Sequence, residues 1–331
     1  MPTVLISTES MIDVRGPWVE MLEEAGFEIQ YPEDHTFSRG LSSQDETVRV
    51  LTGAAAVIAG GEVFTPGVLQ RLPLLRVIAR SGVGYDRIDV AAATACGILV
   101  TITPTANHES VAEQVFALLL GVAKGVVTND ARARAGLWSR RLGQPIRGKT
   151  LGIFGLGRIG RSTAIRGLGM RMSVIATETA PDEHFVRQHD IELVDFDELL
   201  ARSDYLTIHC PLNDETTGLF NREVFARMKE GGVLINTARG RIVVEADLVE
   251  ALKAGPLFAA GLDVFEQEPA LADNPLFELD NVVVSPHIAG ADKLSLEDMA
   301  TEAADCIIKL HSGNWPVGAV VNDDLRKNWK W

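Results

Sequence analysis

The stretch Leu151-Gly-Ile-Phe-Gly-Leu-Gly-Arg-Ile-Gly160 decides the fold of this 331-residue chain. Residues 150–154 form a short apolar run, and Gly155, Gly157 and Gly160 follow in the spacing G-x-G-x-x-G before a helical pattern begins. In this order, the first glycine permits a tight turn, the second lets the backbone approach a pyrophosphate, and the third lets the helix pack on the strand. The alternative is an ordinary α/β turn, because 30 glycines make chance matches common.

A candidate ribose-binding acid lies at the expected distance from this motif. Glu178 follows the apolar run 173–176, where a dinucleotide fold places the acid that binds the adenosine ribose. A carboxylate there accepts hydrogen bonds from both ribose hydroxyls and repels a 2′-phosphate, and residues 177–183 include no Lys or Arg. The sequence therefore predicts NAD rather than NADP. The alternative for Glu178 is a solvated acid at the end of a strand.

The composition narrows the classes of partner. A net charge of −14 argues against nucleic acid or an anionic membrane surface as a partner, since both recruit clustered Lys and Arg. Cys96, Cys210 and Cys306 lack metal-ligand spacing, so we expect free thiols and no bound metal. The N-terminus has no basic segment ahead of an apolar run. We expect a cytoplasmic protein that acts on a small molecule.

Short apolar runs alternate with helical patterns along the whole chain, which predicts an α/β fold with parallel sheets. The length favours two domains. We expect two doubly wound parallel-sheet domains, with a Rossmann NAD-binding domain (102–289) inserted into a flavodoxin-like substrate domain (1–101 and 290–331). Residues 108–124 are expected to form the helix that crosses between them, and a helix over 293–310 returns to the first domain.

Two further segments have open interpretations. Ser81-Gly-Val-Gly84 is a glycine-rich turn after an apolar run, and its backbone N–H groups could hold a carboxylate or form a plain turn. Four arginines surround Trp138 ahead of the glycine motif, in a segment expected to be a solvated basic loop or a contact with substrate or a partner subunit. These arginines are Arg132, Arg134, Arg140 and Arg141.

Three loops that follow predicted strands of the second domain each end in a candidate catalytic residue: Arg239, Glu268 and His287. In the reduction of a 2-oxo acid, a guanidinium can hold the carboxylate bidentately, and an imidazolium can donate a proton as hydride arrives. A carboxylate bonded to the second imidazole nitrogen fixes the tautomer and favours the charged form. The alternative is that Arg239 pairs with a structural acid and that Glu268 is simply exposed.

Five motifs in order resemble the D-isomer-specific 2-hydroxyacid dehydrogenases, and most closely the group that includes D-3-phosphoglycerate dehydrogenase. These motifs are Gly155-Leu-Gly-Arg-Ile-Gly160, His209-Cys-Pro-Leu-Asn-Asp-Glu-Thr216, Leu234-Ile-Asn-Thr-Ala-Arg-Gly240, Leu262-Asp-Val-Phe-Glu-Gln-Glu-Pro269 and Ser285-Pro-His-Ile-Ala-Gly290. The resemblance implies Arg239 as the substrate-orienting residue, His287 as the acid/base and Glu268 as its partner.

The resemblance also implies contacts with ligands and with a second subunit. It assigns the pyrophosphate to Arg158 and Ile159, the nicotinamide to Asp263, and the substrate carboxylate to the backbone of Val83 and Gly84, with Arg239 and His287 completing the substrate contacts. Further NAD contacts are implied along the motifs at Gly155, Gly157, Gly160, Glu178, Cys210, Pro211, Thr216, Thr237, Ala238 and Gly290. A homodimer is implied, with the region 111–124 and the arginine-bearing segment near Trp138 as its interface.

The substrate within this family stays open. Phosphoglycerate enzymes often carry basic residues after the strand that ends here at Ile58-Ala-Gly-Gly-Glu62, and an acid at Glu62 offers nothing to a phosphate. The main expectation is therefore activity on a D-2-hydroxy acid that the sequence does not specify. Phosphoglycerate, or glyoxylate and hydroxypyruvate, are the specific alternatives. Oxidation of formate or phosphite is a minor alternative. A different class, an NAD-sensing transcriptional corepressor, is a further minor alternative.

Overall fold

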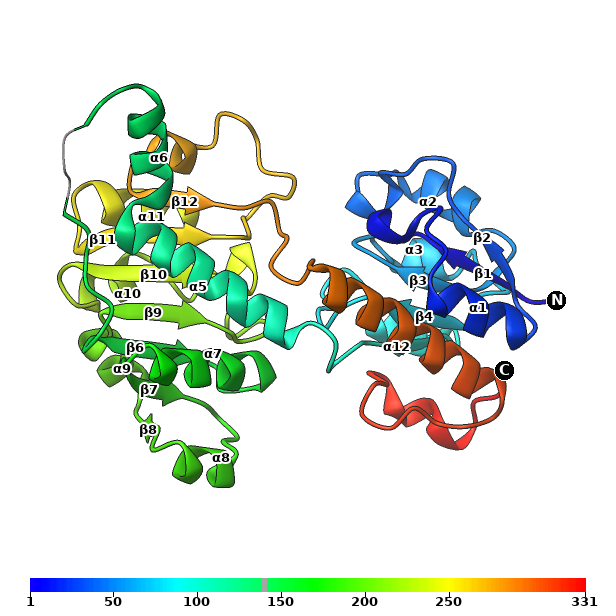
Figure 1. Cartoon of the computed structure of the whole chain (residues 1–331). Coiled ribbons are helices and arrows are strands. Elements are labelled where there is room, and N and C mark those ends of the chain that lie inside the picture. The colour runs from blue at the N-terminus through cyan, green and yellow to red at the C-terminus, as the bar shows by residue number, and fades with distance from the viewer. Residues whose placement is uncertain (139–141) are drawn as a thin grey trace. The chain divides into compact units, whose positions relative to one another are not determined.

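The computed structural model describes residues 1–138 and 142–331. The chain divides into two compact units: Met1–Asn107 together with Ala291–Trp331, and His108–Gly290 (Figure 1). Each unit is an α/β structure built on its own parallel sheet. The chain therefore leaves the first unit once and returns to it once.

The first unit contains five parallel strands in the order β2-β1-β3-β4-β5, the flavodoxin-like arrangement. The strands are β1 (Thr3–Ile6), β2 (Glu28–Gln30), β3 (Ala54–Ala59), β4 (Val77–Arg80) and β5 (Leu99–Thr101). The helices are α1 (Pro17–Glu24), α2 (Gln44–Leu51), α3 (Pro66–Leu69), α4 (Val90–Ala95) and α12 (Lys293–His311). The core lies on both faces of the sheet: α1 and α12 cover one, and α2, α3 and α4 cover the other.

The second unit contains seven parallel strands in the order β12-β11-β10-β9-β6-β7-β8, which is the Rossmann order with one added strand. The strands are β6 (Thr150–Phe154), β7 (Ser173–Thr177), β8 (Glu192–Leu193), β9 (Tyr205–Ile208), β10 (Gly232–Asn236), β11 (Leu257–Leu262) and β12 (Val282–Val284). The helices are α5 (His108–Lys124), α6 (Val126–Arg134), α7 (Arg158–Gly169), α8 (Glu183–Gln188), α9 (Phe196–Arg202), α10 (Arg222–Arg227) and α11 (Glu245–Lys253).

Two apolar layers sandwich the second sheet. Helices α5 and α7 pack on the face that is toward the viewer in Figure 1, where Val115, Leu119 and Ala164 are buried against the strands. Helices α9, α10 and α11 supply the opposite layer, which includes Leu199 and Phe225. The central strands β9 and β10 are buried along their whole length and are mostly apolar, which is why short continuous apolar runs in the sequence indicated them.

The predicted fold class, two doubly wound parallel-sheet domains of which one is Rossmann-like and one flavodoxin-like, is confirmed. The predicted helix over 108–124 matches α5. The expectation of a loop around Arg132 and Arg134 is wrong, because both lie in α6. Helix α6 buries none of its residues, so the apolar periodicity that reveals a helix in sequence is missing there. Arg140 and Arg141 lie outside the described residues.

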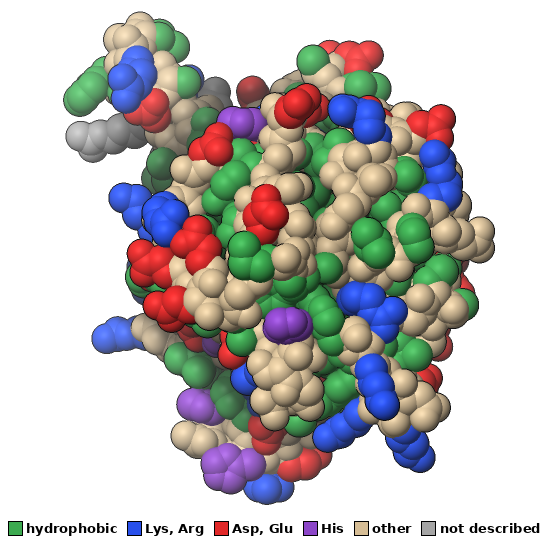
Figure 2. Space-filling view, turned by 90° about the vertical axis from the view of Figure 1, so that its right-hand side faces the viewer, with side chains coloured by type: hydrophobic (Ala, Val, Ile, Leu, Met, Phe, Trp, Pro, Cys, Tyr) green, Lys and Arg blue, Asp and Glu red, His purple; other side chains and the backbone are tan. Residues whose placement is uncertain are grey.

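No single helix in the described part of the chain is long and apolar enough to cross a membrane, although the pair α5 and α6, bent by 57°, passes on length and composition alone. On the face shown in Figure 2, Lys and Arg side chains are interspersed with acidic and apolar ones.

Candidate active site

The strand register of the second unit brings two groups of residues to one edge of the sheet. Phe154 is level with Thr177 on one side and Ile208 on the other, so Gly155, Glu178 and His209 follow neighbouring strand ends. In the same way, Asn236, Leu262 and Val284 are level in β10, β11 and β12. The loops that carry Arg239, Glu268 and His287 therefore all begin at the carboxyl edge of the same sheet, where parallel sheets bind their ligands.

The glycine motif forms the turn between β6 and α7. Gly155 has φ +101°, and a Cβ built there would lie 2.9 Å from the backbone N of Cys210. A Cβ on Gly160 would lie 2.1 Å from the carbonyl oxygen of Gly155, so the helix packs on the turn only with glycine at that position. A Cβ on Gly157 would meet no atom of the described chain within 4 Å, so this position borders open space.

Glu178 lies beside the glycine turn as a carboxylate. Its Oε2 accepts a hydrogen bond from Leu156 N–H at 2.7 Å, and its Oε1 accepts from Thr179 N–H at 2.8 Å and Ala180 N–H at 3.1 Å. Partial burial raises the pKa of Glu178, but the hydrogen bonds from Ala180, Leu156 and Thr179 outweigh it and the pKa lies below its usual range. The acid is therefore ionised, as recognition of ribose hydroxyls requires.

The loop after β9 closes the other side of the turn. Burial lowers the pKa of His209 to about 3, so its imidazole is neutral, and its Nε2 lies 3.0 Å from the Thr207 hydroxyl. Burial likewise raises the pKa of the Cys210 thiol to about 12. The Thr216 hydroxyl donates to the Pro211 carbonyl at 2.7 Å and thereby holds the predicted contact residues of this loop in place.

The residues present fit a dinucleotide. Gly157 gives the backbone access to open space at the start of α7, directly before Arg158 and Ile159. The Thr237 hydroxyl, after β10, is buried and has no hydrogen-bond partner among the described residues. Ala238 N–H next to it donates to the Asn236 side chain at 3.0 Å, which fixes this loop. Gly290 is the last residue of the unit. The individual contacts with NAD stay predictions.

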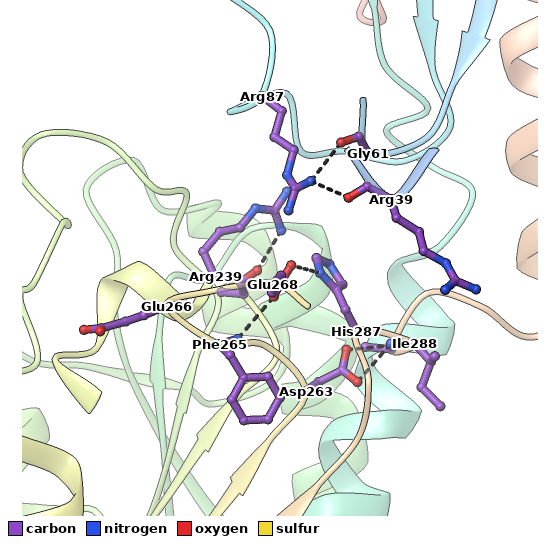
Figure 3. Close-up of polar contacts among 12 residues, drawn as sticks. Arg39, Gly61, Arg87, Arg239, Asp263, Phe265, Glu266, Glu268, His287 and Ile288 are labelled. Carbon is purple, nitrogen blue, oxygen red and sulfur yellow. Dashed lines mark hydrogen bonds and ion pairs between the residues drawn. The ribbon is translucent and has the colours of Figure 1, made fainter. Parts of the chain in front are cut away.

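Arg239 is held at the end of β10 by its own loop. Its Nη1 donates to the Ala238 carbonyl at 2.7 Å, and its carbonyl accepts from Asn236 Nδ2 at 2.9 Å. The following residue, Gly240, packs so closely that a Cβ would lie 1.8 Å from the carbonyl carbon of Phe265. This contact brings the Arg239 loop against the loop that carries Glu268 (Figure 3).

Glu268 and His287 form a direct pair. His287 Nδ1 lies 2.8 Å from Glu268 Oε2, while Glu268 Oε1 accepts from Phe265 N–H at 3.2 Å (Figure 3). The imidazole is 43% exposed, and the Glu268 side chain is 20% exposed. With a carboxylate at Nδ1, Nδ1 carries a proton, and the opposite nitrogen, Nε2, is left for exchange with a substrate. Glu266 points away from this pair.

His287 is held in an uncommon backbone conformation by Asp263. It has φ +53°, in the left-handed region, and its N–H donates to the Asp263 carbonyl at 2.8 Å. The buried Asp263 carboxylate accepts from Ile288 N–H at 3.0 Å, from Ala289 N–H at 2.8 Å and from the Ser285 hydroxyl. Both carboxylate oxygens thus fix the loop on either side of His287, while the nicotinamide contact of Asp263 stays a prediction.

The glycine turn of the first unit lies at the carboxyl end of β4. Gly82 N–H donates to the Thr103 hydroxyl at 2.8 Å, and the Gly82 carbonyl accepts from Thr103 N–H at 3.1 Å. Thr103 is buried, so the turn that presents Val83 and Gly84 is rigidly anchored. The contact of these two residues with a substrate carboxylate stays a prediction.

Reasoning from sequence missed several residues that support the site. Ser285 donates to Asp263, and Gln114 of α5 donates to Ser285 at 3.0 Å, while Ser110 of α5 donates to the Ala289 carbonyl at 2.8 Å. No local pattern identifies Ser110 or Gln114, because they lie more than 170 residues from their partners. Ser285 could have been suspected from its place at a strand end.

A Rossmann sheet with a glycine turn, an acid after the second strand and an acid/base pair at the same edge defines a dinucleotide-binding α/β protein. The family model for the D-isomer specific 2-hydroxyacid dehydrogenase, NAD binding domain, matches residues 116–289. The chain belongs to this family of D-isomer specific 2-hydroxyacid dehydrogenases.

Individual relatives agree with this family. A glyoxylate reductase of Korarchaeum cryptofilum is 40% identical over 78% of this chain and 80% of its own length. A D-3-phosphoglycerate dehydrogenase of Archaeoglobus fulgidus is 40% identical over 85% of this chain, but the match spans only 54% of that protein. The crystal structure of the TT0316 protein from Thermus thermophilus superposes with a TM-score of 0.85 at 36% identity, covering 96% of this chain and all (100%) of that one.

Proposed function

We propose that this protein is an NAD-dependent oxidoreductase that interconverts a D-2-hydroxy acid and its 2-oxo acid. The observation that carries the proposal is the His287–Glu268 pair at 2.8 Å, on the sheet edge that also carries the glycine turn and Glu178. Family membership and the names of the relatives support the reaction class.

When bound, NADH supplies a hydride to the carbonyl carbon of the 2-oxo acid. In this proposal Arg239 orients the substrate carboxylate and polarises the carbonyl through its guanidinium. Protonated His287 then donates its Nε2 proton to the forming hydroxyl oxygen, and Glu268 stabilises the imidazolium through Nδ1. In the reverse direction, neutral His287 accepts the hydroxyl proton at Nε2.

Different residues of the second unit would hold different parts of the cofactor. Glu178 would accept from the adenosine ribose, and the backbone around Gly157 and Arg158 would face the pyrophosphate. Thr237, whose hydroxyl has no hydrogen-bond partner among the described residues, follows β10, and Asp263 accepts hydrogen bonds from the loop that carries His287. The choice of NAD over NADP rests on the ionised state of Glu178.

The test is a panel of 2-oxo acids assayed with NADH, followed by oxidation of the D and L isomers of the best 2-hydroxy acid with NAD. We expect NADH-dependent reduction and oxidation of the D isomer alone. Oxidation of the L isomer would contradict the stereochemical assignment. Binding of NADH without turnover of any substrate would favour a dinucleotide-sensing role instead.

We also propose a homodimer in the cytoplasm. Helix α6 and the residues after it expose large apolar side chains, with Val127 60%, Trp138 84% and Leu142 100% exposed. Large apolar side chains exposed in one short stretch of the chain support a protein interface there. Light scattering on the full chain should give twice the monomer mass, and Val127→Asp should shift it toward the monomer. A monomeric parent protein would contradict the dimer.

A further inference from the structure

Arg161 extends from the first turn of α7 to the loop that carries Glu178. Its N–H donates to the Gly157 carbonyl at 2.9 Å, and its Nη1 donates to Asp182 Oδ2 at 2.6 Å, 21 residues further along the chain. Asp182 follows Glu178 by four residues, in the stretch 177–183 that contains no Lys or Arg. The structure therefore brings to this loop a positive charge that the sequence of the loop lacks.

The ion pair and the contacts of Glu178 join the same two segments of the second unit. Glu178 accepts from Leu156 N–H at 2.7 Å, in the glycine turn, and from Ala180 N–H at 3.1 Å, in its own loop. Asp182, which Arg161 contacts, lies two residues beyond Ala180. The acid expected to bind the adenosine ribose and the arginine are thus held on one short loop beside the start of α7.

Helix α8 holds both members of the pair in place. Asp182 is its N-cap: Oδ1 accepts from His184 N–H and Phe185 N–H, both at 3.1 Å, while Oδ2 accepts from Arg161. The hydrogen bond from Phe185 and the charge of Arg161 keep the pKa of Asp182 below its usual range. The guanidinium also lies 5.6 Å from the centre of the Phe185 ring. Asp182 is therefore ionised and keeps the arginine engaged.

The pair matters more for local charge than for stability. The Arg161 and Asp182 side chains are 31% and 45% exposed, and exposed ion pairs contribute little to folding stability. With Glu178 ionised as well, the three groups leave one net negative charge at the loop. A 2′-phosphate on the ribose would add a charge of about −1.5 to −2 at pH 7. Neutralising Asp182 would make the three groups neutral and release the guanidinium.

We propose that Asp182 is a second determinant of cofactor choice, because it engages the Arg161 guanidinium that would otherwise bind a 2′-phosphate. The proposal rests on the proposed function, in which Glu178 binds the adenosine ribose of NAD. A guanidinium matches a phosphate well, since its planar donors bond two phosphate oxygens, and its long stem lets it turn toward the ribose once it is released. Glu178 repels the 2′-phosphate directly, and Asp182 withholds the counter-charge.

The variant Asp182→Asn tests this role through the binding of NADH and NADPH, which differ only by the 2′-phosphate. Asparagine and serine cap a helix as well as aspartate does, so Asp182→Asn and Asp182→Ser should both retain α8. Fluorescence titration without substrate should show the Kd for NADPH falling about tenfold in both variants, while the Kd for NADH changes less than about twofold. An unchanged Kd for NADPH in both variants would overturn the proposal.

A matched control removes the same charge one residue further along. Glu183 pairs with Arg187 at 3.7 Å within α8, so Glu183→Gln also leaves an arginine without its acid. This variant should leave both dissociation constants unchanged. A gain in NADPH affinity equal to that of Asp182→Asn would assign the effect to the general charge of α8 and contradict the role of Asp182.

The double variant Asp182→Asn/Arg161→Gln separates the guanidinium from the lost negative charge. It should lose the gain in NADPH affinity, whereas Arg161→Gln alone should change the Kd for NADPH less than about twofold, because the parent guanidinium is already engaged. A gain that persists in the double variant would show that Arg161 does not bind the phosphate, against the proposal.

These titrations need no turnover, so they separate this inference from the proposed function. Failure to reduce any 2-oxo acid would defeat the proposed function, while the titrations would still decide the role of Asp182. A parent protein that binds NADPH as tightly as NADH would defeat the inference alone. A parent protein that binds neither dinucleotide would defeat both.

Discussion

The two halves of the carboxyl edge of the seven-stranded sheet are built in different ways. At β6, β7 and β9 the site consists of backbone: a glycine turn, N–H groups bonded to Glu178, and the His209–Cys210 peptide packed against Gly155. At β10, β11 and β12 it consists of side chains, with Glu268 against His287 and Asp263 beneath them. Substitutions that add atoms should therefore disturb the half at β6, β7 and β9 most. Substitutions that remove a functional group should disturb the half at β10, β11 and β12 most.

The largest effect is expected at His287. His287→Asn keeps a residue that tolerates a positive φ but removes the proton donor, so kcat should fall by about 10²–10⁴-fold with little change in NADH affinity. His184→Asn, at an exposed histidine of α8, is the control and should leave kcat unchanged. A kcat of His287→Asn close to that of the parent protein would show that His287 is not the proton donor.

The second-largest effect concerns His209, the neutral histidine that follows β9 beside the glycine turn. Burial lowers the pKa of His209 to about 3, against about 6.5 in the unfolded chain, so below pH 6.5 the unfolded chain gains a proton that the folded chain does not. Stability is therefore lost as pH falls from about 6.5 toward 3. Between pH 7 and pH 5 this loss should be about 2 kcal/mol of unfolding free energy.

The comparison of His209→Gln with the parent chain isolates this contribution, because the remaining titrating groups are shared. The denaturant midpoint of the second unit should fall less between pH 7 and pH 5 in the variant. Parallel pH dependences would show that His209 titrates alike in the folded and unfolded chains.

The third effect separates two glycines of the same turn. A Cβ on Gly160 would overlap the Gly155 carbonyl at 2.1 Å, so Gly160→Ala should cost about 1–3 kcal/mol of stability. A Cβ on Gly157 meets no described protein atom, so Gly157→Ala should keep the parent melting temperature but weaken NADH binding about tenfold or more. Unchanged NADH affinity in Gly157→Ala would place the pyrophosphate elsewhere.

The fourth effect concerns cofactor choice at Glu178. Glu178→Gln loses the charge that repels a 2′-phosphate and weakens the hydrogen bonds from Leu156 and Ala180. We expect kcat/KM with NADH to fall about tenfold, while kcat/KM with NADPH falls less, so the preference narrows. Glu183→Gln, at an exposed acid of α8, is the control. An unchanged ratio would mean that another residue selects the cofactor.

The smallest effect is expected from Glu268→Gln. The substitution keeps the size but replaces the carboxylate partner of His287 Nδ1 by an amide, which holds the tautomer and orientation of the imidazole less firmly, so kcat for reduction should fall a few-fold. Steady-state kinetics with the best 2-oxo acid measures this change. Normal kcat in Glu268→Gln would make Glu268 a structural acid.

The sequence by itself determined the parts of this protein that depend on local spacing. Short apolar runs predicted both parallel sheets, and the spacing of Gly155, Gly157, Gly160 and Glu178 predicted a dinucleotide turn, because strand, turn and helix are encoded within about 30 residues. Arg239, Glu268 and His287 were candidates for a related reason. Each follows a predicted strand, and the carboxyl ends of parallel strands lie at one edge of a sheet.

Only the tertiary structure decided which way the other polar side chains point. Asp263 anchors the His287 loop, Glu62 turns inward, and Arg87 reaches the loop after β3, and none of these follows from spacing along the chain. Helix α6 also escaped prediction, because a helix that buries no residue leaves no apolar period to detect. Periodicity reports which face of an element is buried, whereas hydrogen-bond partners depend on which loops the completed sheet brings together.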